Sequence, residues 1–293
     1  MSIKIARGGL ALGLALGLSG CAATFDHRAD PSIEILAASL TPRMSSYQDL
    51  LALPEPRGRI VASVYSFRDQ TGQYKPAPAS SFSTAVTQGA ASMLVSAMND
   101  SGWFIPLERE GLQNLLTERK IIRAALNKPN VPDNNSEDLP SLLAANILLE
   151  GGVVAYESNV RTGGAGARYL GIGGSEQYRV DQVTVNLRAI DIRSGRILHD
   201  VMTTKTILSK EITAGVYTFV DFRRLLELEA GTTVNEPAQL CVLSAIETAL
   251  IHLIVDGLDA RSWGLANPAD DGAPVLRRYR EARNGVDGGA TAG

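Results

Sequence analysis

"VDQVTVNLRAIDIRSGRILHDVMTTKTIL" (residues 180–208) is the stretch that decides the fold. Apolar residues alternate with polar ones through its first half, at Val183, Val185, Leu187 and Ala189. Ser194-Gly195 then interrupts the pattern before a second β-branched run begins. Strict alternation is typical of a half-buried strand, and a Ser-Gly pair is typical of a turn. The stretch therefore predicts two strands joined by a turn at residues 194–195.

Elements of both kinds precede and follow this strand pair. Strands are predicted at 58–67, 103–106 and 145–158 from β-branched and aromatic content. Helical spacing of apolar residues predicts helices at 82–102, 111–126 and 237–258, the first capped by Ser80 or Ser81 and stopped by Gly102. Glu247 and His252 interrupt the third helix, which we therefore expect to be buried and not to span a membrane. This order of elements indicates an α/β or α+β core.

The N-terminus has the pattern of an export signal. In "MSIKIARGGLALGLALGLSGCAA" (residues 1–23), Lys4 and Arg7 precede an apolar run that is too short to span a bilayer. "LSGC" resembles a bacterial lipobox, in which Cys21 becomes the acylated first residue of the mature chain. An ordinary signal peptide with an incidental cysteine is the alternative. The residue after the cysteine is Ala22, whereas an aspartate at that position would favour retention at the inner membrane. We therefore expect lipid anchoring at the outer membrane.

Domain boundaries follow from these patterns. We expect a signal peptide at 1–20, a lipidated tether or adapter at 21–53 and one folded domain at 54–265. Residues 266–293 are rich in Gly, Ala and Asp, and we expect them to be disordered.

Composition and motifs argue against an enzyme, a metal site and nucleic-acid binding. The net charge is −3, without the basic excess that nucleic acid requires. The three histidines are far apart in sequence, and GxSxG, GxxxxGK[ST] and paired cysteines are absent from the sequence. We expect His199 and His252 to be structural or surface residues, and Cys241 to be a buried small apolar residue. No cofactor is expected apart from the covalent lipid on Cys21.

The glycine-rich stretch "RTGGAGARYLGIGG" (residues 161–174) invites a comparison with dinucleotide-binding loops. Gly164 and Gly166 supply two glycines of GxGxxG, but Tyr169 occupies the third position. A period-two segment follows, so no helix N-terminus is available for a pyrophosphate. The stretch does not predict a nucleotide site.

Membrane hairpins fit this stretch better. Val160–Val180 and Lys210–Ala230 each contain 21 residues, enough for two tilted membrane strands and a tight turn. Apolar residues change from even to odd positions near Asp181-Gln182, as a strand would if one part faced lipid and the next a protein core. A surface β-extension with a bulge is the alternative. Two hairpins cannot close a barrel, so insertion requires a ring of subunits.

Four segments carry a family resemblance: "SVYSFRDQTGQYKPAPASSFSTAVTQGAASMLVSAM", "WFIPLEREGLQNLLTERKIIRAA", "GARYLGIG" and "NEPAQLCVLSAIET". Together they resemble the curli production assembly/transport component (CsgG) family, from about Thr41 to Asp259 and including the lipobox. The resemblance implies a periplasmic α/β domain like an anticodon-binding domain, without nucleic-acid binding. It implies two hairpins per subunit, at 160–180 and 210–230, that form a shared transmembrane barrel.

The resemblance also implies function, partners and a pore constriction. Known members form rings of nine subunits in the outer membrane and export unfolded curli subunits by nucleotide-independent diffusion, with periplasmic and surface accessory proteins. The constriction maps to Ala77, Ser81 and Phe82, where family members carry tyrosine, asparagine and phenylalanine. The smaller residues imply a wider, less polar throat. Phe82 could instead staple the start of the following helix to the core. The alternative function is a monomeric, outer-membrane-anchored binding or assembly factor.

Overall fold

The computed structural model describes residues 40–41, 43–75, 82–126, 139–162, 177–213, 216–220 and 237–289 of the chain. The chain divides into two compact units, Met1–Thr41 and Pro42–Gly293. Only residues 40–41 of the first unit are described, so the fold below is that of the second. The predicted signal peptide and Cys21 lie outside the described residues.

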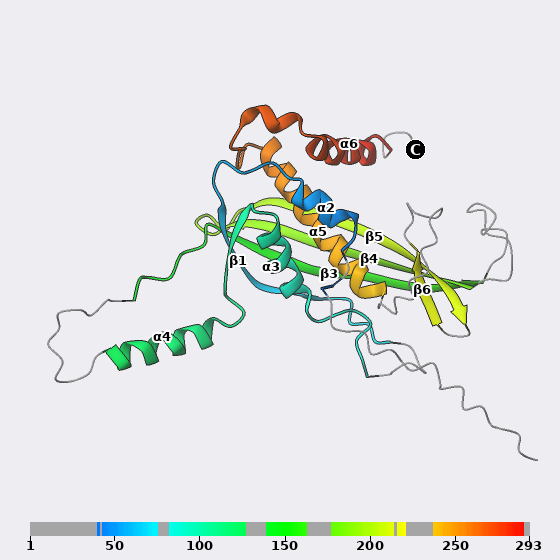
Figure 1. Cartoon of the computed structure of the whole chain (residues 1–293), viewed down its shortest axis with the longest axis horizontal. Helices are drawn as coiled ribbons and strands as arrows, with labels where there is room; N and C mark the ends of the chain where they lie inside the picture. The colour runs from blue at the N-terminus through cyan, green and yellow to red at the C-terminus, as the bar shows by residue number, and fades with distance from the viewer. Residues whose placement is uncertain are drawn as a thin grey trace, which may run out of the picture. The chain divides into compact units, whose positions relative to one another are not determined.

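One mixed sheet of six strands forms the centre of this unit (Figure 1). The strands are β1 Ile60–Asp69, β2 Phe104–Leu107, β3 Ile147–Thr162, β4 Gln177–Asp191, β5 Ile197–Thr213 and β6 Val216–Val220. Their order is β2-β1-β3-β4-β5-β6, with β2, β1 and β3 parallel and the remaining neighbours antiparallel. The strand pair predicted over 180–208 is confirmed, and Gly195 takes the left-handed conformation in its turn, with φ of 70°.

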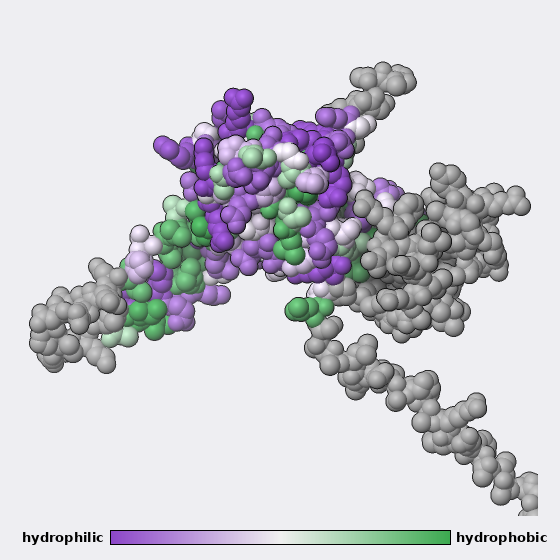
Figure 2. All heavy atoms as spheres, turned by 45° about the horizontal axis from the view of Figure 1, so that its top comes forward, coloured by the Kyte–Doolittle hydropathy of each residue, from purple (hydrophilic) through white to green (hydrophobic). Residues whose placement is uncertain are grey.

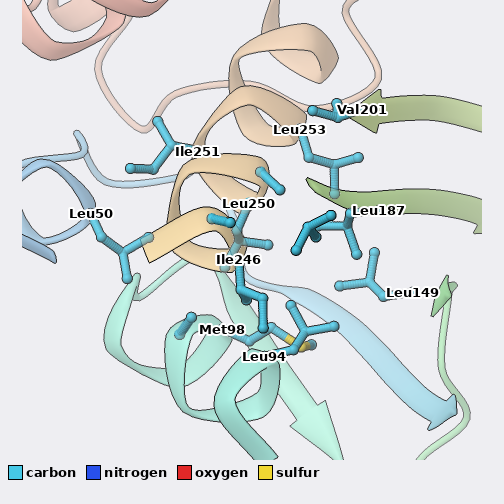
Figure 3. Close-up of a cluster of buried hydrophobic side chains, with 14 of the residues drawn as sticks. Leu50, Leu94, Met98, Leu149, Leu187, Val201, Ile246, Leu250, Ile251 and Leu253 are labelled. Carbon is cyan, nitrogen blue, oxygen red and sulfur yellow. The ribbon is translucent and has the colours of Figure 1, made fainter. Parts of the chain in front are cut away.

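Helices cover one face of the sheet. The helices are α2 Ser45–Leu51, α3 Ala90–Asp100, α4 Leu112–Leu126, α5 Pro237–Asp259, the 3₁₀-helix η2 Pro268–Gly272 and α6 Pro274–Gly289. Helix α5 packs across β4 and β5, α3 packs on β1 and β2, and α2 lies against α5. Figure 3 shows Leu94 and Met98 of α3 meeting Ile246 and Leu250 of α5. The core lies between these helices and the sheet.

Helix α5 is a core helix, as the sequence predicts. It is long and apolar enough to cross a membrane by length and composition, but 83% of its most apolar window is buried inside the protein. Its buried side chains face the sheet on one side and α2 and α3 on the other. Burial on nearly all sides explains why its apolar residues show no single stripe.

The helix predicted from residue 82 begins later than expected. Helix α3 starts at Ala90, and residues 82–89 are not helical. The backbone of this stretch bonds to the chain before it: the Lys75 N–H donates to the Ser83 oxygen over 2.8 Å, and the Ala85 N–H donates to the Gln73 oxygen over 2.8 Å. β-Branched Thr84, Val86 and Thr87 also have low helix propensity. The predicted stop is confirmed, since Gly102 has a φ of 69°.

Both ends of the expected domain are corrected. Residues 45–51 of the predicted tether form α2, whose Leu50 is fully buried, and Leu53 beyond it is also buried. The expectation of a disordered tail is wrong for residues 268–289, which form η2 and α6. Leu276 and Tyr279 lie three residues apart and are buried on the body. Composition concealed this helical period because glycine, alanine and aspartate surround it.

Candidate functional site: the strand extensions and the loop before helix α3

Strands β3, β4 and β5 continue past the helices that cover the sheet. Cys241, in the first turns of α5, lies 3.4 Å from the Asp181 carbonyl oxygen and 3.5 Å from that of Lys205. Beyond Asp181, on the side away from the core, β3 still pairs with β4 from Asn159↔Val180 to Thr162↔Gln177. β5 pairs with β6 from Leu208↔Val220 to Thr213↔Val216. At the first predicted hairpin, residues 160–162 pair with 177–179, and residues 163–176 lie outside the described residues. At the second, the described pairing lies within residues 208–220, and residues 221–236 lie outside the described residues, so the hairpin over 210–230 stays a prediction.

Strand β3 changes its buried face where it enters this region. Val153 and Tyr156 are both buried although they differ in parity, because one extra residue sits between Val153 and Ala155 opposite β4. In β4, buried residues keep odd positions as far as Asp181. The side chains of residues 177–179 are outside the described set, so the phase change predicted near Asp181-Gln182 stays a prediction.

A buried carboxylate lies at the root of the first extension. Asp181 is completely buried, and the Tyr156 hydroxyl donates to its Oδ1 over 2.8 Å. This bond joins β3 to β4 just beyond the bulge. A buried carboxylate is costly unless it accepts such bonds. Tyr156 and Asp181 therefore fix the two strands where they leave the core.

Cys241 is buried beside this carboxylate and is free of disulfides. Burial, with a smaller contribution from the negative charge of Asp181, raises the pKa of its thiol to about 12. A thiol that stays protonated is a poor nucleophile. The expected role as a small buried residue is confirmed.

The loop between β1 and α3 is closed at its base. The Asp69 carboxylate accepts from the Thr71 N–H over 2.9 Å and from the Thr71 hydroxyl over 2.7 Å. Tyr74 and Thr84 then form an isolated antiparallel bridge. The expected constriction residues Ala77 and Ser81 lie in the tip, outside the described residues.

Phe82 follows directly after that tip, and its side chain is 92% exposed. Because Phe82 lies eight residues before α3 and is not buried, the alternative in which it staples a helix to the core is wrong. Beneath the loop, a cavity of about 180 Å³ is lined by Lys75, residues 84–87, Ala238 and Gln239, so the base of the loop faces the start of α5.

The two described histidines support the body, as expected. His199 Nε2 lies 2.8 Å from the Ser262 hydroxyl, and His252 contacts the Tyr279 ring edge to face. Burial, with a smaller contribution from Arg283, lowers the pKa of both imidazoles. Among the described residues, no three His, Cys, Asp or Glu side chains gather as a metal ion would require.

Sequence reasoning missed the ion pairs that hold the start of the folded domain. Arg43 lies 3.5 Å from both Glu247 of α5 and Asp100 of α3. The Ser46 hydroxyl donates to Glu247 over 2.6 Å, and burial is the main cause of the raised pKa of that carboxyl. Glu247 is about 200 residues from Arg43 and Ser46 in sequence, Asp100 is 57 residues from Arg43, and no local pattern joins them.

Comparison with known proteins places this geometry in a family. The family model for the curli production assembly/transport component CsgG matches residues 43–283. The chain belongs to the CsgG family. The Salmonella typhimurium LT2 protein named "Curli production assembly/transport component CsgG" is 55% identical over 264 residues, covering 90% of this chain and 93% of that protein. The Escherichia coli K12 protein of the same name is 55% identical over 263 residues, with the same coverage.

More distant proteins also align. The Caulobacter vibrioides protein named "Putative transcription activator protein HfaB" is 27% identical over 295 residues, covering 92% of this chain and 83% of that protein. Among solved structures, lipoprotein GNA1162 from Neisseria meningitidis aligns with a TM-score of 0.27 and 10% identity, covering 50% of this chain and 82% of that one. The match to the CsgG family from residue 43 to 283 includes most of α6, which lies beyond Asp259, the end of the resemblance expected from sequence.

Proposed function

We propose that this chain is the subunit of an oligomeric outer-membrane channel that exports unfolded curli subunits from the periplasm. Membership of the CsgG family supports the role in curli production and transport. One structural observation carries the channel itself: β3, β4, β5 and β6 stay paired as strands beyond the level at which α5 covers them.

Such extensions favour a barrel shared between subunits. A membrane-spanning sheet must close on itself, because lipid offers no hydrogen bonds to an open edge. The four strand arms of one chain are too few to close a pore, so copies must combine in a ring, for which the family resemblance suggests nine. The lumen is then lined by the inward side chains of each hairpin. Cys21 carries the lipid that holds each subunit at the outer membrane.

The loop before α3 forms the throat in this proposal. The β-bridge between Tyr74 and Thr84 closes the base of the loop, and the exposed ring of Phe82 offers apolar contact to a passing extended chain. Ala77 and Ser81 carry small side chains, so Phe82 is the bulkiest of the three constriction residues. Movement requires no nucleotide on this chain; an extended polypeptide diffuses through and is withdrawn as it folds and polymerises outside.

The experiment is a paired measurement on the full chain purified in mild detergent. Mass photometry gives the size of the particle, and planar bilayers give its conductance. We expect a ring of several copies that conducts ions in discrete steps. A monomer without conductance would contradict the channel and favour the alternative of a monomeric binding or assembly lipoprotein.

A further inference from the structure

Among the described residues, no helix covers one face of the sheet. Helices α2, α3 and α5 all lie on the opposite face (Figure 1). On the uncovered side, which we call the open face, strand register places Tyr65, Ile105, Leu148, Ile190 and Met202 together. Tyr65 is 49% exposed and Met202 66%. Parallel strands such as β2, β1 and β3 are normally covered on both faces, so the open face is an unfilled position in the fold.

The chain path indicates which element belongs on the open face. Connections between parallel strands of one sheet are right-handed. The β1-α3-β2 connection crosses the sheet in one direction and puts α3 on the covered face. The β2-α4-β3 connection crosses back in the opposite direction, so the same handedness assigns α4 to the open face.

Helix α4 does not occupy that position in its own chain. Figure 1 shows it projecting from the body, and among the described elements it packs extensively against no other helix or strand. Leu112, Leu115, Leu116 and Ile122 share one side of it, and Ile122 is 40% exposed. Figure 2 shows hydrophobic residues along this projecting helix.

Contacts before the helix and at its middle hold α4 in the projecting position. Before the helix, the Gly111 N–H donates to Glu108 over 2.6 Å, and Arg109 donates to the Leu143 oxygen over 3.0 Å. On the helix, the Arg119 guanidinium donates to the Pro140 oxygen. These bonds tie α4 to the returning segment at 139–143, away from the sheet.

Charge is complementary between α4 and the open face. Helix α4 carries Arg119, Lys120 and Arg123 against the single carboxylate of Glu118. At the centre of the open face, Glu150 and Asp200 stand on either side of Arg188, which lies 3.8 Å from Glu150. The cations on the helix therefore have carboxylate partners on the sheet in Glu150 and Asp200, beside Arg188 and Arg68.

We propose that α4 of one copy packs on the open face of a second copy of this chain. Each copy then gives one helix and receives another, which is a head-to-tail contact of the kind that closes rings. The inference deepens the proposed channel and rests on it for the existence of a ring. It places this contact in the folded domain, apart from the strand extensions.

Cross-linking of two differently tagged full-length chains, co-expressed and purified in detergent, tests the contact. One chain carries Ile122→Cys and the other Tyr65→Cys, and a short bifunctional maleimide joins cysteines that lie close together. Buried Cys241 does not compete. We expect a cross-linked pair that contains both tags. Ile121→Cys, on the opposite side of α4 and 54% exposed, is the matched control and should give no such pair.

The other outcomes separate this contact from the ring. If rings form without the cross-linked pair that contains both tags, the proposed contact of α4 is wrong, while the proposed channel is still supported. A cross-link only within one chain that carries both cysteines shows that α4 closes on its own sheet, and also overturns it. A monomer overturns both proposals.

A charge substitution gives an independent reading. Ile122→Glu should weaken assembly by about tenfold or more in subunit concentration, whereas Ile121→Glu should leave it near wild type. Because α4 lies outside the core, the monomer melting temperature should be unchanged for both variants. Equal assembly of the two variants would overturn the proposal.

Discussion

At the scale of single residues, two side chains define the candidate site in different ways. Asp181 is buried and is fixed by Tyr156 at the point where strands leave the core. Phe82 is exposed on a loop whose base is closed by backbone bonds. Asp181 fixes β3 against β4 where they leave the core, whereas Phe82 presents an aromatic ring at the surface. Substitutions at the two positions should therefore affect different measurements.

Tyr156→Phe removes the hydroxyl that donates to Asp181 and should lower the free energy of unfolding by about 1–3 kcal/mol, since a buried carboxylate then loses a donor. Urea unfolding of a soluble Cys21→Ala form measures the change. Tyr65→Phe, on the open face and 49% exposed, is the matched control and should change it by less than about 0.5 kcal/mol. Equal effects of the two variants would show that the bond to Asp181 does not stabilise the fold.

In the proposed channel, Phe82→Ala should raise single-channel conductance, because it removes the bulkiest of the three side chains that the proposal places in the throat. Planar-bilayer recording compares it with Tyr74→Ala, which shortens an exposed aromatic side chain at the base of the loop. Only Phe82→Ala should change the conductance. An unchanged value for that variant would remove Phe82 from the throat.

At the scale of elements, α6 is held on the body by a series of arginines. Arg278 pairs with Asp49 of α2, Arg280 with Asp259 and Asp271, and Arg283 with Asp256 of α5. Beneath them, Tyr279 packs on His252, and burial raises the pKa of the Tyr279 phenol well above its usual value. These ion pairs surround the imidazole of His252, whose lowered pKa keeps it neutral in the folded protein. Protonation of His252 would add a buried positive charge beside Arg283, so the attachment of α6 should depend on pH.

Stability of α6 docking should fall as the pH is lowered through the folded pKa of His252. Burial first, and Arg283 second, lower that pKa below its unfolded value of about 6.5. The imidazole is neutral in the folded state, so its contribution is complete above about pH 6.5 and is lost on acidification. Glu247 acts in the opposite sense, because its folded pKa is raised and acidification relieves the cost of its buried charge.

His252→Phe isolates the histidine, since a phenyl ring keeps the contact with Tyr279 without a titratable group. The urea midpoint of wild type should fall more between pH 7.5 and 5.5 than that of the variant, and the contribution of Glu247 cancels in the comparison. Hydrogen exchange at α6 locates the change. A pH response identical in the two proteins would exclude His252 as its source.

At the scale of the whole molecule, a compact domain bears strand extensions at one end of its sheet and a projecting helix. The N-terminal end of the folded domain is held by Arg43 against Glu247 and Asp100. In the proposed channel, lipid on Cys21 places this domain at the outer membrane, where the extensions can insert. Anchoring and insertion are separate requirements, and the two cysteines of the chain allow them to be tested separately.

Cys21→Ala should release the protein into the soluble periplasmic fraction and abolish curli export, because the acyl anchor is lost while the domain still folds. Cell fractionation and a curli-binding dye measure the two effects. Cys241→Ala, which changes a buried thiol in α5, should stay with the membrane and is the matched control. Membrane association of Cys21→Ala at the wild-type level would contradict lipid anchoring at this residue.

The sequence by itself determined the elements whose period is local. Alternation over 180–208 predicts β4 and β5, and helical spacing over 111–126 and 237–258 predicts α4 and α5. Side chains on one strand or helix carry that information directly, because each period follows from backbone geometry. The family was also evident from four segments of sequence, and the match to residues 43–283 confirms it.

Only the tertiary structure decided where α3 begins, that α6 folds, and which partners meet at the site. Residues 82–89 lose their helical period to backbone bonds with residues 73–75, and α6 is stabilised by contacts with α2 and α5. Tyr156 meets Asp181 across two strands, 25 residues away. Burial and hydrogen bonding between distant segments depend on how the whole chain packs. They therefore leave no repeating pattern in the sequence of either segment.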